Sequence, residues 1–138
     1  NGDLSVYWSN SRSMARFGLL ALNNGNWNGT QIINTTFFTN ATTTSQNINE
    51  AYGYLWWLNG KTNYMVPSEQ TVFQGSLVPN APADMYAAMG AKDQRIYVIP
   101  SKKMVVIRMG DVANPENPTF ALSGFDAELW TKISALYQ

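Results

Sequence analysis

Cysteine and histidine are both absent from this 138-residue chain. Without cysteine, the chain has neither a disulfide framework nor a thiol nucleophile. Without either residue, it lacks the usual ligands of a zinc site and cannot use histidine as a catalytic base. These absences exclude thiol, zinc and histidine-based chemistry from the chain itself.

Charged residues are scarce as well, at 13% of the sequence, and nine basic residues balance nine acidic ones. The largest basic cluster is the pair Lys102-Lys103, whereas nucleic-acid binding needs a concentrated positive surface. No apolar run approaches the roughly 20 residues of a membrane-spanning helix. The composition therefore predicts neither a nucleic-acid partner nor a membrane span.

Apolar residues, in contrast, are plentiful at 45% of the chain, enough for the core of one compact domain. The predicted fold is organised around residues 84–110, where we expect three short β segments over residues 85–88, 95–99 and 104–109. Apolar β-branched and aromatic side chains fill most of residues 95–99. This composition is typical of a central strand that is covered on both faces.

Helices are expected on either side of this meander. The first is predicted over residues 13–23 with Ser11 or Ser13 as its N-cap, and a shorter one over residues 35–42 with Asn34 as its cap. The last is predicted over residues 124–137, with an apolar stripe made of Phe125, Leu129, Ile133 and Leu136.

A further strand is expected over residues 52–58, and the sequence Asn59-Gly60 predicts a tight turn into a return strand over residues 61–66. Helices that cover an antiparallel sheet define the α+β class. We therefore predict a central antiparallel sheet flanked by helices.

The residues by themselves show no complete catalytic apparatus. No serine is followed three positions later by lysine, Tyr-x-Asn is absent, and Lys61-Thr62 is followed by Asn63 rather than glycine. Glycine-rich phosphate loops and calcium loops are absent too, so no cofactor is expected. The carboxylates are scattered, and we expect Asp84 and Asp93 to be solvated on the surface rather than paired.

Several separate motifs nevertheless resemble one enzyme family in their order and spacing. They are Met14-Ala15-Arg16-Phe17-Gly18-Leu19-Leu20, Leu22-Asn23, Gly25, Trp27-Asn28-Gly29, Tyr52-Gly53-Tyr54-Leu55-Trp56-Trp57, Ala87-Ala88-Met89-Gly90 with Gln94, and Tyr97-Val98-Ile99-Pro100. Together they resemble the C-terminal part of the serine β-lactamase-like hydrolases, in the penicillin-binding-protein superfamily. The resemblance is greatest to the class C-like esterases and the 6-aminohexanoate-dimer hydrolase group.

The resemblance implies that residues 1–138 are a single partial domain, the C-terminal part of an α/β/α sandwich of the β-lactamase and transpeptidase type. In the family, the nucleophilic serine, its helper lysine and the tyrosine of Tyr-x-Asn lie in a preceding N-terminal part. That part would be the partner of this chain, and an ester, amide or peptide would be the substrate. The resemblance also implies a bacterial protein of the periplasm or the cell exterior.

At the level of single residues, the family's third motif, Lys-Thr-Gly, falls on Ala88-Met89-Gly90. Gly90 would let the substrate lie against the strand, and the backbone N–H of Ala91 would be one of two oxyanion donors. The alternative is that Gly90 only makes a turn. Ala88 and Met89 cannot pair with an anion, so the resemblance implies a neutral ester or amide rather than a β-lactam.

Two further positions have open roles. Lys92 either contacts an anionic group of the substrate or is a solvated turn residue. Trp56 or Trp57 could line an acyl pocket, but not both, because neighbouring strand residues point to opposite faces.

Two other functions remain open. One is a degenerate, non-catalytic relative that binds peptide or cell-wall ligands. The other is a carbohydrate-binding module, suggested by five tryptophans and seven tyrosines. We rank the second last because the aromatic residues lie in apolar strand and helix patterns.

Overall fold

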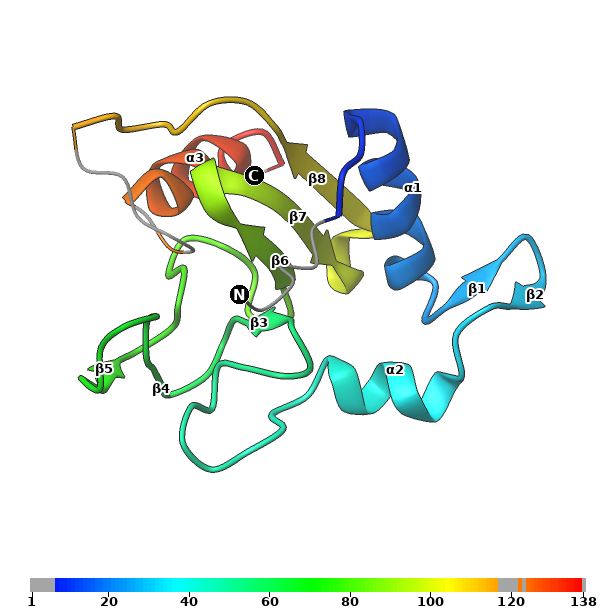
Figure 1. Ribbon diagram of the computed structural model, residues 1–138, viewed down its shortest axis with the longest axis horizontal. Coiled ribbons are helices and arrows are strands. Elements are labelled where there is room, and N and C mark those ends of the chain that lie inside the picture. The colour runs from blue at the N-terminus through cyan, green and yellow to red at the C-terminus, as the bar shows by residue number, and fades with distance from the viewer. Residues whose placement is uncertain (1–6, 117–121, 123, 138) are drawn as a thin grey trace, which may run out of the picture.

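The computed structural model describes residues 7–116, 122 and 124–137. Its centre is an antiparallel sheet of four strands in the order β3-β6-β7-β8 (Figure 1). The strands are β3 (Trp57–Leu58), β6 (Tyr86–Gly90), β7 (Gln94–Ile99) and β8 (Met104–Arg108). The predicted meander of three strands and the α+β class are thus confirmed, although β6 continues two residues beyond its predicted end.

The central strand β7 is buried on both faces, as its composition predicted. Ile96 and Val98 belong to a core cluster on one face of the sheet, whereas Tyr97 and Ile99 belong to a second cluster on the other. This alternation follows from the two-residue period of a strand. The sheet therefore separates two apolar cores, each of which needs its own cover.

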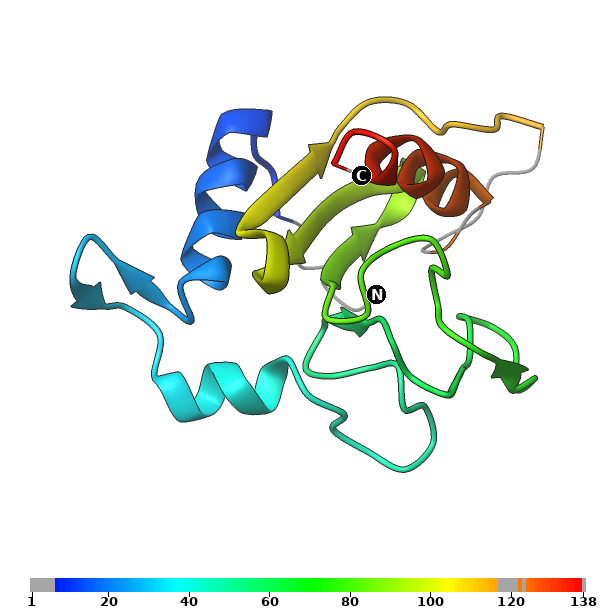
Figure 2. The same cartoon turned by 180° about the vertical axis from the view of Figure 1, so that it is seen from behind.

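Helix α1 (Ser11–Leu22) covers the first face and lies along β8 in both views (Figures 1 and 2). It begins two residues earlier than predicted because the side chain of Asn10, rather than a serine, caps it by accepting the N–H of Ser13 at 2.9 Å. A Cβ at Gly18 would lie 2.4 Å from Cγ1 of Val105. The missing side chain at that position lets the helix approach β8 closely.

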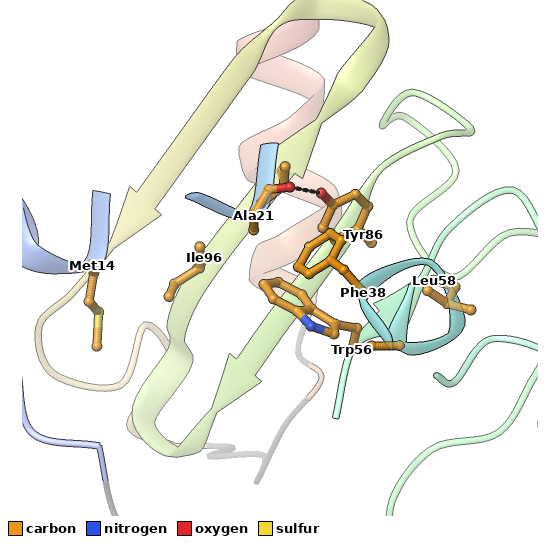
Figure 3. Packing of buried hydrophobic residues seen from close by; sticks show 9 residues of the cluster. Met14, Ala21, Phe38, Trp56, Leu58, Tyr86 and Ile96 are labelled. Atoms are coloured by element: carbon orange, nitrogen blue, oxygen red, sulfur yellow. Dashed lines mark hydrogen bonds between the residues drawn. The ribbon is translucent and has the colours of Figure 1, made fainter. Parts of the chain in front are cut away.

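Helix α2 (Thr35–Ala41) completes this core, and its predicted cap, Asn34, is confirmed. Phe38 of α2 packs against Trp56 and Tyr86 (Figure 3). The rings of Trp56 and Tyr86 meet edge to face with their centroids 5.1 Å apart, and the Tyr86 hydroxyl donates to the carbonyl of Ala21 at 3.0 Å. Aromatic contacts of this kind tie α1, α2 and β6 together.

Helix α3 (Gly124–Ser134) contributes to the core on the second face, through Trp130. Trp130 is fully buried and meets the ring of Tyr97 edge to face, with their centroids 5.4 Å apart. The predicted apolar stripe is only partly right, because Leu136 lies beyond the helix and is 84% exposed. The buried residues of α3 are Trp130 and, unexpectedly, Asp126.

Two small hairpins lie at opposite ends of the molecule (Figures 1 and 2). One joins β1 (Asn26–Trp27) to β2 (Thr30–Gln31), and the other joins β4 (Asn63–Tyr64) to β5 (Phe73–Gln74).

The predicted hairpin of residues 52–58 and 61–66 is wrong, because β3 is only two residues long and pairs with β6. The reason lies in Asn59, which is buried and donates its side-chain amide to the carbonyls of Val78, Ala81 and Pro82. Asn59 thus binds a distant loop instead of closing a two-residue turn.

Within the described ranges, no helix has both the length and the apolar character needed to cross a membrane.

Candidate functional site

The predicted site lies where β6 ends and turns into β7. Ala88, Met89 and Gly90 are the last three residues of β6 and are half-buried, whereas Ala91 and Lys92 are exposed in the following 3-10 turn, η1 (Ala91–Asp93). β3 pairs only with the first two residues of β6. Among the described residues, the end of β6 therefore has no partner strand on its outer side.

Gly90 has an ordinary extended backbone, with φ of −113° and ψ of 172°. A Cβ at this position would lie 3.7 Å from its nearest neighbour, the Cβ of Gln94. The residues with left-handed backbone in this connection are instead Lys92, with φ of 56°, and Asp93, with φ of 57°. The conformation of the turn therefore does not require glycine at position 90.

The side chains around this strand end divide between the two faces of the sheet. Ala88 packs against the same cluster as Trp56, whereas Met89 packs against the cluster that contains Trp57 and Trp130. The two neighbouring tryptophans point to opposite faces, as predicted. Trp56 therefore shares a face with Ala88, but its ring is buried in the aromatic core.

Sequence reasoning missed a buried ionic cluster directly behind this strand end. Asp93, expected on the surface, is 1% exposed, and its Oδ1 lies 2.9 Å from Nη2 of Arg95. Nε and Nη2 of Arg95 also donate to the two carboxylate oxygens of Asp126, at 2.8 and 3.0 Å. The hydroxyl of Tyr97 donates to Oδ1 of Asp126 at 2.5 Å.

Asp84 and Asp93 do not meet. Asp84 precedes β6 and accepts the backbone N–H of Ser101 at 2.6 Å, beyond the end of β7, whereas Asp93 lies just before the start of β7. Asp84 is exposed, as expected. The expectation of a solvated carboxylate is thus right for Asp84 and wrong for Asp93.

The guanidinium of Arg95 uses all five of its N–H donors inside the protein. Besides the two carboxylates, Nη1 donates to the carbonyl of Gly90 at 3.0 Å and to that of Gln94 at 3.2 Å. Burial alone would lower the pKa of Arg95, but the hydrogen bond and the charge of Asp126 raise it overall. Arg95 therefore stays protonated and holds carboxylates and strand backbone together.

Arg108 lies directly opposite Arg95 on β8. Its guanidinium donates to the carbonyls of Lys92, Asp93, Gly110 and Asp111. Gln94 adds a side-chain donor to the carbonyl of Lys92, at 2.7 Å. The connection between β6 and β7 is therefore held from its carbonyl side by three side chains.

Tyr97 predicts an alkaline limit to stability. Burial, and then the charge of Asp126, raise the pKa of Tyr97 above its ordinary value. The unfolded chain loses this phenolic proton above about pH 10 while the folded chain keeps it, so the free energy of unfolding should fall as the pH rises from there. Urea unfolding measured below and above about pH 10 should show a smaller fall in the free energy of unfolding for Tyr97→Phe than for the unchanged protein.

Burial also raises the pKa of Tyr86, so the double variant Tyr86→Phe/Tyr97→Phe should show the smallest fall. A fall as large in the double variant as in the unchanged protein would contradict this assignment.

Comparison with known proteins supports the fold. No protein-family model matches the chain, and no curated protein sequence matches it. Its structure is similar to that of a Bacillus anthracis protein named "Putative 6-aminohexanoate-dimer hydrolase", with 22% sequence identity and a TM-score of 0.55. The likeness covers 91% of this chain and 27% of the other, so this chain spans 27% of the length of that protein. The chain therefore has the α+β fold of the matching part of that protein.

Proposed function

We propose that this chain is the C-terminal portion of a serine hydrolase that cleaves an ester or amide through an acyl-enzyme. In this proposal, residues 1–138 form one partial domain that contributes the strand beside the active site and one oxyanion donor. The fold likeness supports it, because 91% of this chain matches 27% of the longer neighbour. The resemblance of the separate motifs supports it independently.

The observation that carries the proposal is the conformation of Gly90. Neither its backbone angles nor its surroundings demand a glycine, and it ends a strand whose outer side has no partner in the described part of the chain. A residue without Cβ lets another molecule lie close to the backbone. We infer that the substrate takes that space.

The chemistry follows from the backbone N–H of Ala91. When a serine oxygen attacks the substrate carbonyl, negative charge develops on the carbonyl oxygen. A preorganised backbone donor stabilises that charge by roughly 3–4 kcal/mol and needs no particular side chain. The serine, its lysine and the tyrosine of Tyr-x-Asn would come from the N-terminal part.

The substrate side of the site is apolar. Ala88 and Met89 replace the lysine and threonine that the family's β-lactamases place here, so no cation of this motif holds a carboxylate. Ala88 and Met89 lie at the end of β6, and Trp56 packs on the same face of the sheet as Ala88. These residues favour a neutral ester or amide, with Lys92 exposed at the rim.

Exposed aromatic side chains support the N-terminal part as the missing partner. Several large apolar side chains are exposed, among them Tyr7, Trp8, Phe17, Phe37, Tyr54 and Leu55. Phe17 stacks on Trp56 with centroids 6.2 Å apart, and Tyr7 lies 6.0 Å from Phe17. A surface of this kind usually contacts another segment or protein. We propose that the N-terminal part covers it, in a bacterial protein of the periplasm or the cell exterior.

The test is covalent labelling of the complete polypeptide that contains this chain. A fluorophosphonate should label one serine upstream of Asn1, and p-nitrophenyl acetate should be hydrolysed. A folded complete protein that does neither would contradict the proposal. If the upstream sequence also lacks Ser-x-x-Lys, the degenerate, ligand-binding alternative would replace it.

Gly90→Ala should separate function from stability. Because φ is negative and there is room for a Cβ, the free energy of unfolding of the variant should equal that of the unchanged protein or exceed it by up to about 1 kcal/mol. The added methyl group should nevertheless block the approach of substrate, so kcat/KM for an ester should fall. Urea unfolding and ester hydrolysis measured on the same preparation check this, and unchanged hydrolysis would contradict the role of Gly90.

A further inference from the structure

We infer that Arg95 is a positioning residue for catalysis, because its bond to the carbonyl of Gly90 fixes the direction in which the N–H of Ala91 points. This inference rests on the proposed function. It assigns a role to a buried side chain that touches neither the substrate nor the nucleophile. It also gives the cluster of Arg95, Asp93 and Asp126 a purpose beyond packing.

The geometry of the peptide bond carries the first step. The described residues contain no cis peptide bond, so the Gly90–Ala91 peptide is trans and planar. In such a unit the carbonyl of Gly90 and the N–H of Ala91 point in opposite directions. Nη1 of Arg95 binds this carbonyl at 3.0 Å, on the side of the cluster. The N–H of Ala91 is therefore directed away from the cluster.

The hydrogen bonds of the turn explain why a side chain is needed here. In a regular antiparallel ladder, the carbonyl of Gly90 would accept from a backbone N–H of the neighbouring strand. The N–H of Gln94, its Cα partner, donates instead to the carbonyl of Ala91 and closes the 3-10 turn. Arg95 therefore donates to the carbonyl of Gly90 in place of a strand N–H. This bond holds the peptide at the end of β6 in one orientation.

Arg95 is itself held firmly enough to define that orientation. Asp126 binds it through two parallel hydrogen bonds from α3, and Asp93 binds it from the turn. Bidentate bonds of this kind fix the plane of a guanidinium. The position of the Ala91 N–H is thus connected to α3 through two side chains.

Stability alone explains this arrangement poorly. Buried ion clusters are often no more stable than apolar residues of the same volume, because removing the charges from water is costly. Arg108 on the neighbouring strand also binds carbonyls of the turn, but not that of Gly90. The two arginines are Cα partners, so they form a matched pair for experiment.

The test compares Arg95→Lys with Arg108→Lys in the complete protein. Lysine keeps the positive charge but cannot span Gly90 and both carboxylates. We expect Arg95→Lys to lower kcat by about 100-fold, the effect of a small misplacement of a catalytic group, with KM nearly unchanged. Arg108→Lys should lower kcat by only a small fraction of the fall expected for Arg95→Lys. Equal losses in the two variants, or a change in KM instead of kcat, would overturn the inference.

A second readout does not depend on activity. With 15N-labelled alanine, the amide signal of Ala91 should shift and exchange faster in Arg95→Lys than in Arg108→Lys. If the complete protein proves inactive, the proposed function fails, and this signal alone decides whether Arg95 orients the peptide. An Ala91 signal equally affected in both variants would then overturn the inference.

Asp126→Asn provides a second variant in case Arg95→Lys does not fold. It leaves Arg95 and its bond to Gly90 in place but removes the charge that anchors the guanidinium from α3. We expect a smaller loss in the same parameter, kcat, and a change in the same Ala91 signal. If neither changes, the connection through α3 is wrong.

Discussion

Arg95→Met is expected to lower the free energy of unfolding by about 3–5 kcal/mol. Methionine fills much of the volume, but it removes the guanidinium that lies between Asp93 and Asp126, two carboxylates that are 1% and 2% exposed. Burying a carboxylate without its cation is costly because the charge has left water. Urea unfolding, followed by tryptophan fluorescence, measures the loss.

Arg108→Met is the matched control on the neighbouring strand. Arg108 is only half-buried and binds backbone carbonyls, which water can serve in its place, so the cost should be much smaller. The triple variant Arg95→Met/Asp93→Asn/Asp126→Asn should recover part of the loss, because the buried charges are gone. If Arg95→Met costs no more than Arg108→Met, the cluster does not contribute to stability in this way.

Ala91→Pro should lower kcat by about 100- to 1,000-fold, the effect of removing one oxyanion donor. Proline lacks the backbone N–H but suits this position. Ala91 is the first residue of a 3-10 turn with an exposed side chain, and Gly90 before it is extended, with ψ of 172°. Proline is accepted at the start of a helical turn and favours an extended residue before it.

Ala91→Ser is the control for Ala91→Pro, since it changes the side chain and keeps the N–H. It should retain most of the activity in the same ester hydrolysis assay. A thermal unfolding curve for each variant shows whether the fold persists. Full activity of a folded Ala91→Pro variant would show that Ala91 is not an oxyanion donor.

The central sheet could be predicted from sequence because its pattern is local. Strand β7 has β-branched and aromatic residues at most positions, a pattern that indicates a strand. The residues with left-handed backbone that end α1, Asn24 and Gly25, lie next to the helix that they terminate. The hairpin expected at Asn59 failed for the opposite reason. Its side chain binds carbonyls about twenty residues later, a contact that no local pattern indicates.

Only the strand end of the candidate site could be predicted from the sequence, and the ionic cluster next to it could not. The strand end at Gly90 is contiguous in the sequence, so a motif could locate it. The ionic cluster behind it joins Asp93 and Arg95 to Asp126, which lies 31 residues after Arg95. An arginine in an otherwise apolar buried strand was the available signal, since a buried cation needs carboxylates. Which carboxylates they are follows only from the packing of α3.

The most direct test of the central claim is a crystal structure of the complete protein with a phosphonate bound to its nucleophilic serine. The phosphonyl oxygen that mimics the oxyanion should lie about 2.7–3.1 Å from the backbone nitrogen of Ala91, with the ligand against the outer side of β6 at Gly90. A phosphonate whose oxygen accepts no hydrogen bond from Ala91, or that lies away from this strand end, would contradict the account.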